Sequence, residues 1–128
     1  QLGRRSLPIA AARAVLGADA WIGYSAHDAA EAVPAAADGA DFVVVGAVYR
    51  TASHPERAPA GPGLVREATA ALAPVEVPVI GIGGITPGRV GEVLAAGAYG
   101  VAVLGGVWHA RDPVAATADY IAALGESG

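Results

Sequence analysis

The stretch Pro78–Thr86 reads PVIGIGGIT, so that three glycines interrupt an apolar run. Glycine is unfavourable inside a strand, because it has no side chain to pack and loses more conformational freedom on folding than any other residue. A strand that ends in GIGG therefore indicates that the backbone turns sharply there or that another group comes very close to it. Pro87 follows at the position that proline prefers at the start of a helix, so the stretch predicts a strand, a turn and a helix.

The same alternation of apolar strand and helix runs through the chain. Strands are predicted over residues 21–25, 41–46, 77–84 and 99–106. Helices are predicted over residues 8–16, 29–38, 64–73, 87–96 and 113–124. Three of the four strands are apolar throughout, which is typical of strands covered on both faces. Strands that alternate with helices predict an α/β fold with a parallel sheet.

Local signals set the expected helix ends. Ser6 is expected to cap the first helix, and Asp28 with Glu31 has the spacing of a capping box for the second. Pro34 falls inside that second helix, where proline removes a backbone donor and clashes with the preceding turn. We therefore expect a kink or a break at Pro34.

The composition indicates a single globular domain. The chain has 128 residues, of which 54% are hydrophobic and 16% charged. A net charge of −4 gives no support for nucleic-acid binding, and no apolar run is long enough to span a membrane. The chain has no cysteine, so a disulfide framework and a thiolate metal site are excluded, and we expect a cytoplasmic protein. The absence of methionine, with Gln1 first, leads us to expect a piece of a longer protein.

One connection is much longer than the others. It covers residues 46–63 and contains several prolines and glycines, so it cannot form a regular element. Loops of this length in a compact domain are usually functional or mobile. This loop also follows the carboxyl end of a strand, where α/β folds place their binding sites.

Five motifs in this order resemble the thiamine phosphate synthase / TenI family. They are LGRRSLPIAAARAVLG (2–17), IGYSAHDAAEA (22–32), GADFVVVGAVYRTASHP (39–55), PVIGIGGITPGRV (78–90) and AGAYGVAVLGGVW (96–108). The resemblance implies a (β/α)8 TIM-type barrel in which the four predicted strands are strands 5–8. Residues 1–128 would then be the C-terminal half of the barrel domain, and the missing N-terminal half or a second copy would be needed to close it.

The resemblance also implies an activity on small phosphorylated substrates. The synthase is a transferase of thiamine biosynthesis that joins hydroxymethylpyrimidine pyrophosphate to thiazole phosphate and releases pyrophosphate. A TenI-like thiazole tautomerase is the first alternative, but its acid/base histidine falls at Ala47. A non-catalytic phosphate-binding or regulatory domain is the second alternative, and no catalytic residue is assigned.

Two groups of binding residues follow from the resemblance. The residues expected to bind pyrophosphate are Ser25, Thr51, Ser53 and His54, the last at the position of the family's lysine. The residues expected to hold a phosphate through backbone N–H groups are Gly83, Gly84, Gly105 and Gly106. In the alternative interpretation these glycines only permit tight turns. If they form a phosphate site, Gly84→Val should weaken ligand binding and barely change the unliganded fold.

Magnesium is a possible cofactor by resemblance. Ser6 stands where synthases have an acidic Mg²⁺ ligand, and a hydroxyl is a poorer ligand than a carboxylate. No metal site is therefore predicted from this chain. His27 is left open between the site and the surface, and His109 is expected at the rim of the barrel.

Overall fold

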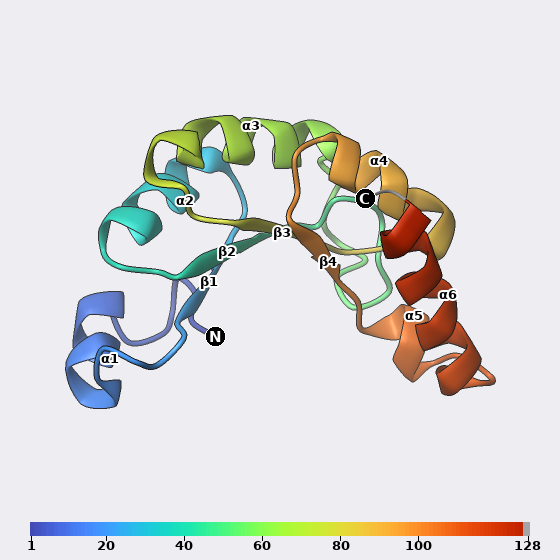
Figure 1. Ribbon diagram of the computed structural model, residues 1–128, viewed down its shortest axis with the longest axis horizontal. Coiled ribbons are helices and arrows are strands. Elements are labelled where there is room, and N and C mark those ends of the chain that lie inside the picture. Colours follow the sequence, from blue (N-terminus) through green and yellow to red (C-terminus); the bar gives the residue numbers. More distant parts are fainter. Residues whose placement is uncertain (127–128) are drawn as a thin grey trace.

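The protein is described by a computed structural model that covers residues 1–126. Four parallel strands form one sheet in chain order, which confirms the expected α/β fold (Figure 1). The strands are β1 (Gly23–Ala26), β2 (Phe42–Val45), β3 (Val79–Ile82) and β4 (Gly100–Ala102). Leu2 pairs with Tyr24 in an isolated parallel bridge, so a short piece of chain lies beside the free edge of β1.

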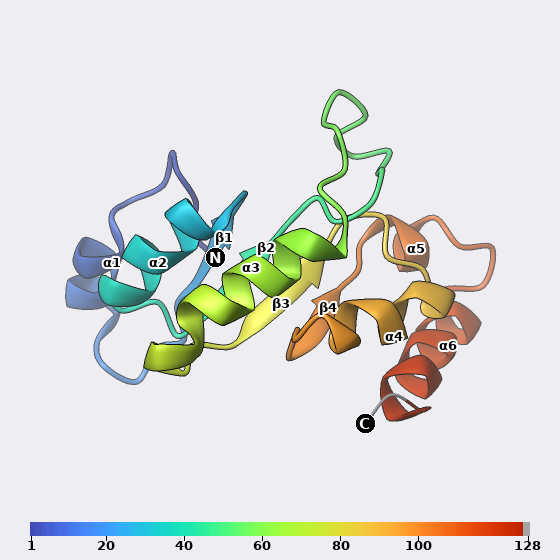
Figure 2. The same ribbon diagram turned by 90° about the horizontal axis from the view of Figure 1, so that it is seen from above.

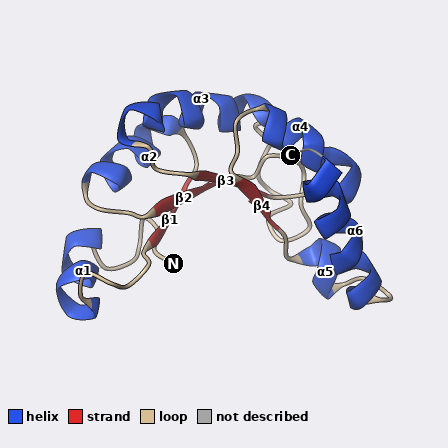
Figure 3. Cartoon of the chain, viewed as in Figure 1, coloured by secondary structure: helices blue, strands red, loops and turns tan. Residues whose placement is uncertain are grey.

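Helices connect the strands and lie on the convex side of a curved sheet, as Figures 1 and 3 show. They are α1 (Ile9–Leu16), α2 (Ala29–Ala37), α3 (Pro62–Leu72), α4 (Pro87–Ala95), α5 (Gly105–Trp108) and α6 (Pro113–Glu126), with a 3-10 turn over Ala73–Val75. None of the helices within residues 1–126 is long and apolar enough to cross a membrane.

The core lies between the sheet and these helices. Val43 and Val45 of β2 are fully buried against Val65 of α3 and Val90 of α4. Burial of each such side chain contributes about 2 kcal/mol to folding. Because side chains alternate along a strand, Val44 lies on the opposite, concave face. The prediction that both faces are covered is therefore wrong for residues 1–126, in which helices cover the convex face alone.

Two strands end earlier in the structure than was predicted from the sequence. The strand predicted to reach residue 84 ends at Ile82, because Gly83 has a positive φ of 103° that leaves the β region. The strand predicted to reach residue 106 ends at Ala102, and α5 begins at Gly105. The hydrogen bond from the Trp108 N–H to the Leu104 carbonyl closes this unexpected turn of helix.

Helix α2 corrects one local prediction and confirms another. Pro34 lies inside the helix without breaking it, because it sits on the exposed side while Ala32 and Ala35 pack into the core. The expected cap is present, since the Asp28 carboxylate accepts a hydrogen bond from the Glu31 N–H at 2.8 Å. Ser6 does not cap α1: its hydroxyl accepts a hydrogen bond from the Gly3 N–H at 3.0 Å instead.

Glu31 joins the first turn of α2 to the preceding chain. Its carboxylate accepts hydrogen bonds from the backbone N–H of His27 and from the His27 ring, both at 2.9 Å, and pairs with Arg4. Burial alone would raise the pKa of Glu31, but these hydrogen bonds outweigh it and lower the pKa to about 2. The ionised carboxylate therefore stabilises the fold at neutral pH.

We predict that Glu31→Gln lowers the free energy of unfolding by about 2 kcal/mol at pH 7. The pKa falls on folding, so the contribution is complete above the ordinary value of 4.5 and is lost as the pH drops toward 2. Chemical denaturation at several pH values should show the two proteins converging over that range. Glu67→Gln, on the exposed side of α3, is the matched control and should leave stability within about 0.5 kcal/mol at every pH. A difference that persists at pH 2 would contradict this account.

The Gly83–Gly84 turn answers the question that its sequence raises. Both residues have positive φ angles, 103° and 60°. The segment that follows β2 also lies directly against them: the N–H groups of Val48 and Tyr49 donate to the carbonyls of Ile82 and Gly83, each at 2.9 Å. A Cβ atom at Gly83 would lie 2.8 Å from the Ala47 Cα, and one at Gly84 would overlap the Arg50 carbonyl oxygen. The backbone turns sharply, and another stretch of backbone approaches it.

We expect Gly84→Ala to destabilise the protein by about 3 kcal/mol, because the new methyl group overlaps a backbone oxygen and Gly84 has a left-handed conformation. Gly88→Ala is the matched control, since Gly88 lies in α4 with open space around it. That change should be neutral or stabilise by up to about 1 kcal/mol. Urea denaturation measures both, and equal effects at the two sites would refute the argument from close approach.

Candidate functional site

A cleft of about 710 Å³ opens at the carboxyl end of the sheet. The β2–α3 loop (residues 46–61) projects beyond this end of the sheet, near α5 (Figure 2). All eight residues expected to bind phosphate groups line this one cleft: Ser25, Thr51, Ser53, His54, Gly83, Gly84, Gly105 and Gly106. The structure therefore brings together residues that lie as far as 81 positions apart in the sequence (25 to 106).

Three arginine and three histidine side chains line the cleft. They are Arg50, Arg57, Arg89, His27, His54 and His109. None of the 12 carboxylates of the chain is among the lining residues of this described cleft, although the net charge is −4. A concave surface with charge of one sign concentrates ligands of the opposite sign. The sequence did not reveal this clustering, because the arginines are scattered singly around the motifs.

Two pairs of neighbouring glycines contribute backbone N–H groups to the lining of the cleft. Within residues 1–126, the N–H groups of Gly83, Gly84, Gly105 and Gly106 donate to no other group of the protein. Backbone amides of this kind are suitable donors for the oxygens of an anion. Gly105 and Gly106 were expected at the end of a strand, but they are the first residues of α5.

Packing accounts for three of these four glycines. Gly83 and Gly84 are crowded by the β2–α3 loop, and a Cβ atom at Gly106 would overlap the Tyr120 hydroxyl. Gly105 has more room, since its nearest neighbour would be the His109 Nδ1 at 3.6 Å. The expectation that Gly84→Val barely changes the unliganded fold is therefore wrong. Phosphate binding by the glycine amides stays a prediction.

Two tyrosines form hydrogen bonds that connect the elements around the cleft. The buried Tyr120 of α6 donates a hydrogen bond from its hydroxyl to the Ile85 carbonyl at 2.8 Å. Tyr49 donates from its hydroxyl to the Glu92 carboxylate, and burial together with that carboxylate raises the pKa of Tyr49 to about 12. The Arg89 guanidinium lies 4.4 Å above the Tyr49 ring. Tyr49 therefore stays protonated at neutral pH and acts as a structural residue.

His27 is placed at the cleft, which settles the question that its sequence left open. It follows the last residue of β1 and lines the cleft beside Ser25. One ring nitrogen lies 2.9 Å from Glu31, and the other lies 2.6 Å from the Arg57 guanidinium. No sequence signal pointed to the contact with Arg57, which lies 30 residues away.

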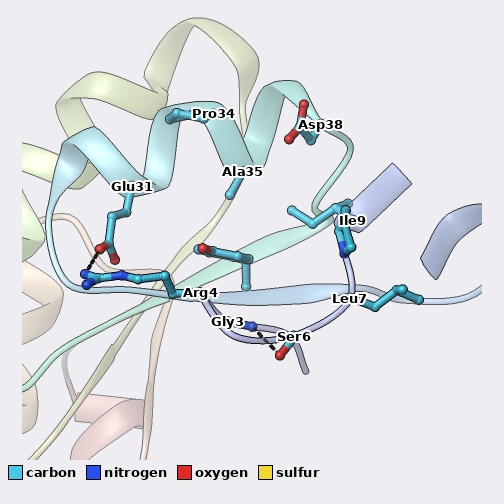
Figure 4. A pocket seen from close by; sticks show the side chains of 11 residues that line it. Gly3, Arg4, Ser6, Leu7, Ile9, Glu31, Pro34, Ala35 and Asp38 are labelled. Carbon is cyan, nitrogen blue, oxygen red and sulfur yellow. Dashed lines mark hydrogen bonds and ion pairs between the residues drawn. The ribbon is translucent and has the colours of Figure 1, made fainter. Parts of the chain in front are cut away.

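Ser6 lies in a different pocket, of about 340 Å³, between the first residues and α2. Figure 4 shows Ser6 there with Arg4, which reaches Glu31. Ser6 is not among the residues that line the larger cleft.

The residues described do not fit a magnesium site. Mg²⁺ prefers carboxylate oxygens, and the larger cleft has none among its lining residues. The Ser6 hydroxyl is already occupied by the Gly3 N–H, and residues 1–126 contain no group of three or more His, Cys, Asp or Glu side chains placed to hold a metal.

Comparisons with known proteins agree with this geometry. Residues 1–107 match the family model described as thiamine monophosphate synthase. The chain is 47% identical over 124 residues to a thiamine-phosphate synthase of Salinispora arenicola, covering 96% of this chain and 58% of the relative. It is 50% identical over 119 residues to that of Haloquadratum walsbyi, covering 91% of this chain and 52% of the relative. The chain therefore spans little more than half the length of these relatives.

A solved structure shares the fold. It is described as thiamine phosphate pyrophosphorylase from Pyrococcus furiosus and superposes with a TM-score of 0.86 at 31% identity, covering 99% of this chain and 59% of that one. The curved parallel sheet with helices on one side matches the barrel-like fold of that protein. The family resemblance carried by the five motifs is confirmed, and the chain belongs to the thiamine monophosphate synthase family.

Proposed function

We propose that this chain is the phosphate-binding part of an enzyme that joins hydroxymethylpyrimidine pyrophosphate to thiazole phosphate. The observation that carries the proposal is the cleft itself, which combines arginines, histidines and free glycine amides without any carboxylate among its lining residues. Such a lining suits two phosphorylated substrates. The synthase names of relatives near 47% identity give the activity its chemical identity.

The two ends of the cleft suit two different phosphate groups. Thr51, Ser53 and Arg57, on the β2–α3 loop, offer hydroxyls and positive charge for the pyrophosphate. The amides at Gly83–Gly84 and Gly105–Gly106 offer neutral donors for the single phosphate of the thiazole.

The reaction needs positioning and charge stabilisation more than acid–base catalysis. The thiazole nitrogen forms a bond to the pyrimidine methylene carbon, and the bond from that carbon to the pyrophosphate oxygen breaks. Negative charge grows on the departing pyrophosphate, so cations held beside it stabilise the transition state. Holding both substrates in one cleft also removes much of the entropic cost of their encounter.

We also propose that the four strands are strands 5–8 of an eight-stranded barrel. Ile80 and Ile82 are half-buried and point away from the helix layer, toward the concave face that no helix within residues 1–126 covers. Apolar surface of this kind is stable when a further layer of chain buries it. The greater length of the relatives favours the N-terminal half of the barrel as that layer, and a second copy of this chain is the other possibility. We further propose that the enzyme is cytoplasmic, because charged phosphorylated metabolites are retained in that compartment.

We predict that Arg50→Gln weakens pyrophosphate binding about tenfold, because it removes from the cleft lining a cation that has no carboxylate partner within residues 1–126. Titration calorimetry at two salt concentrations measures this, and added salt should reduce the wild-type affinity because partly exposed charges are screened. Arg111→Gln is the matched control, an exposed arginine outside the cleft that should bind as the wild type does. Equal affinities for all three proteins would rule out an anion site at Arg50.

The full-length protein is expected to convert the two substrates into thiamine phosphate and pyrophosphate in equal amounts. Thr51→Val keeps the side-chain shape but removes the hydroxyl, and it should lower kcat/KM about tenfold. Coupled detection of pyrophosphate with chromatography of the product provides the measurement. Binding of both substrates without product would favour the non-catalytic alternative. Proton exchange on a carboxythiazole phosphate alone would favour the tautomerase.

A further inference from the structure

The tip of the β2–α3 loop, residues 51–59, has one polar connection to the rest of the described chain. Its internal contacts are the bond from the Arg57 N–H to the His54 carbonyl, the bond from the Ser53 N–H to the Thr51 hydroxyl, and ion pairs of Glu56 with His54 and Arg57. Outside the tip, within residues 1–126, the only hydrogen-bond partner of these residues is His27, which meets the Arg57 guanidinium at 2.6 Å. Among the hydrogen bonds of the described chain, this contact alone links the tip to the sheet end of the cleft.

The chemistry of the partners fixes the form of the His27 ring. Arginine has donors but no acceptor, so the ring nitrogen that meets Arg57, Nε2, must offer a lone pair. The proton of the neutral ring therefore sits on Nδ1, where it donates to Glu31 at 2.9 Å. Glu31 is ionised at neutral pH and is held by Arg4 and by the His27 N–H as well, so it is a fixed acceptor. The bond from Nδ1 to Glu31 fixes the orientation of the His27 ring, so that Nε2 points in a defined direction.

We propose that His27 is a positioning residue: the Glu31-oriented ring holds the loop tip over the cleft through Arg57. His27 stands at the carboxyl end of β1 and is therefore anchored to the sheet, whereas Arg57 belongs to an exposed loop. Arg57, Thr51 and Ser53 all line the cleft, so the loop tip supplies a guanidinium and two hydroxyls to the lining. The inference rests on the proposed function only for its effect on pyrophosphate, because the contact exists without a ligand.

Nuclear magnetic resonance on the unliganded full-length protein tests the positioning itself. In His27→Phe, the backbone order parameters of residues 51–59 should fall below about 0.6, the range of flexible segments. His27→Gln keeps an acceptor for Arg57 and a donor for Glu31, so it should restore the wild-type values. His109→Phe is the matched control, since His109 also lines the cleft but makes no side-chain hydrogen bond in the described chain, and it should leave the loop unchanged. Nitrogen chemical shifts should show the proton of wild-type His27 on Nδ1.

Kinetics of the same variants provide the second arm. His27→Phe should raise KM for the pyrophosphate substrate about fivefold with less than a twofold change in kcat. The double variant His27→Phe/Arg57→Gln should be no worse than Arg57→Gln alone, because the two residues act through one contact. Unchanged order parameters in His27→Phe, or additive losses in the double variant, would overturn the inference. If the loop loosens as expected but no variant binds pyrophosphate, the proposed function fails while the positioning role stands.

Discussion

The contact between the start of the β2–α3 loop and the Gly83–Gly84 turn is the constraint on which the site depends. The loop can lie there only because neither turn residue has a side chain, and the bonds from Val48 and Tyr49 to the end of β3 hold it in place. Arg89 adds a further link, since it stacks on Tyr49 and donates to the Gly84 carbonyl at 3.2 Å. The close packing that requires glycine at positions 83 and 84 therefore also holds the loop that contributes residues to the cleft lining.

Acidic and basic side chains are mixed along the sequence but lie in different parts of the structure. The 12 carboxylates outnumber the eight arginines, yet the carboxyl end of the sheet gathers three of those arginines and all three histidines of the chain. Three carboxylates lie close to this lining and have partners in the structure: Glu31 pairs with His27 and Arg4, Glu56 pairs with His54 and Arg57, and Glu92 accepts from Tyr49. None of the three is among the residues that line the cleft, so the overall acidity of the chain says little about what the cleft binds.

Periodicity and turn chemistry were enough to predict the order of the elements, because each strand and helix has local signals such as Pro87 after Thr86 or Asp28 before Glu31. They failed where tertiary packing decides. Pro34 survives inside α2 because two buried alanines anchor that helix, and α5 appears where a strand was expected. The eight residues that line the cleft could be named from the family motifs, and their binding role stays a prediction. The contact between His27 and Arg57 could not be named, since it depends on how a long irregular loop folds back.

Hydrogen bonds between the two ends of the β2–α3 loop divide it into a base whose sequence is constrained and a tip whose sequence and length can vary. The N–H groups of Ala60 and Gly61 donate to the carbonyls of Ala47 and Val48, at 3.1 and 2.8 Å, so the two ends of the loop are joined before the tip begins. A longer tip then costs little, because closure entropy grows slowly with loop length. Insertions and loop grafts should therefore be accommodated between residues 51 and 59 and rejected at 47–50. This makes the tip the natural place for engineering or evolution to alter the lining of the cleft without rebuilding the sheet.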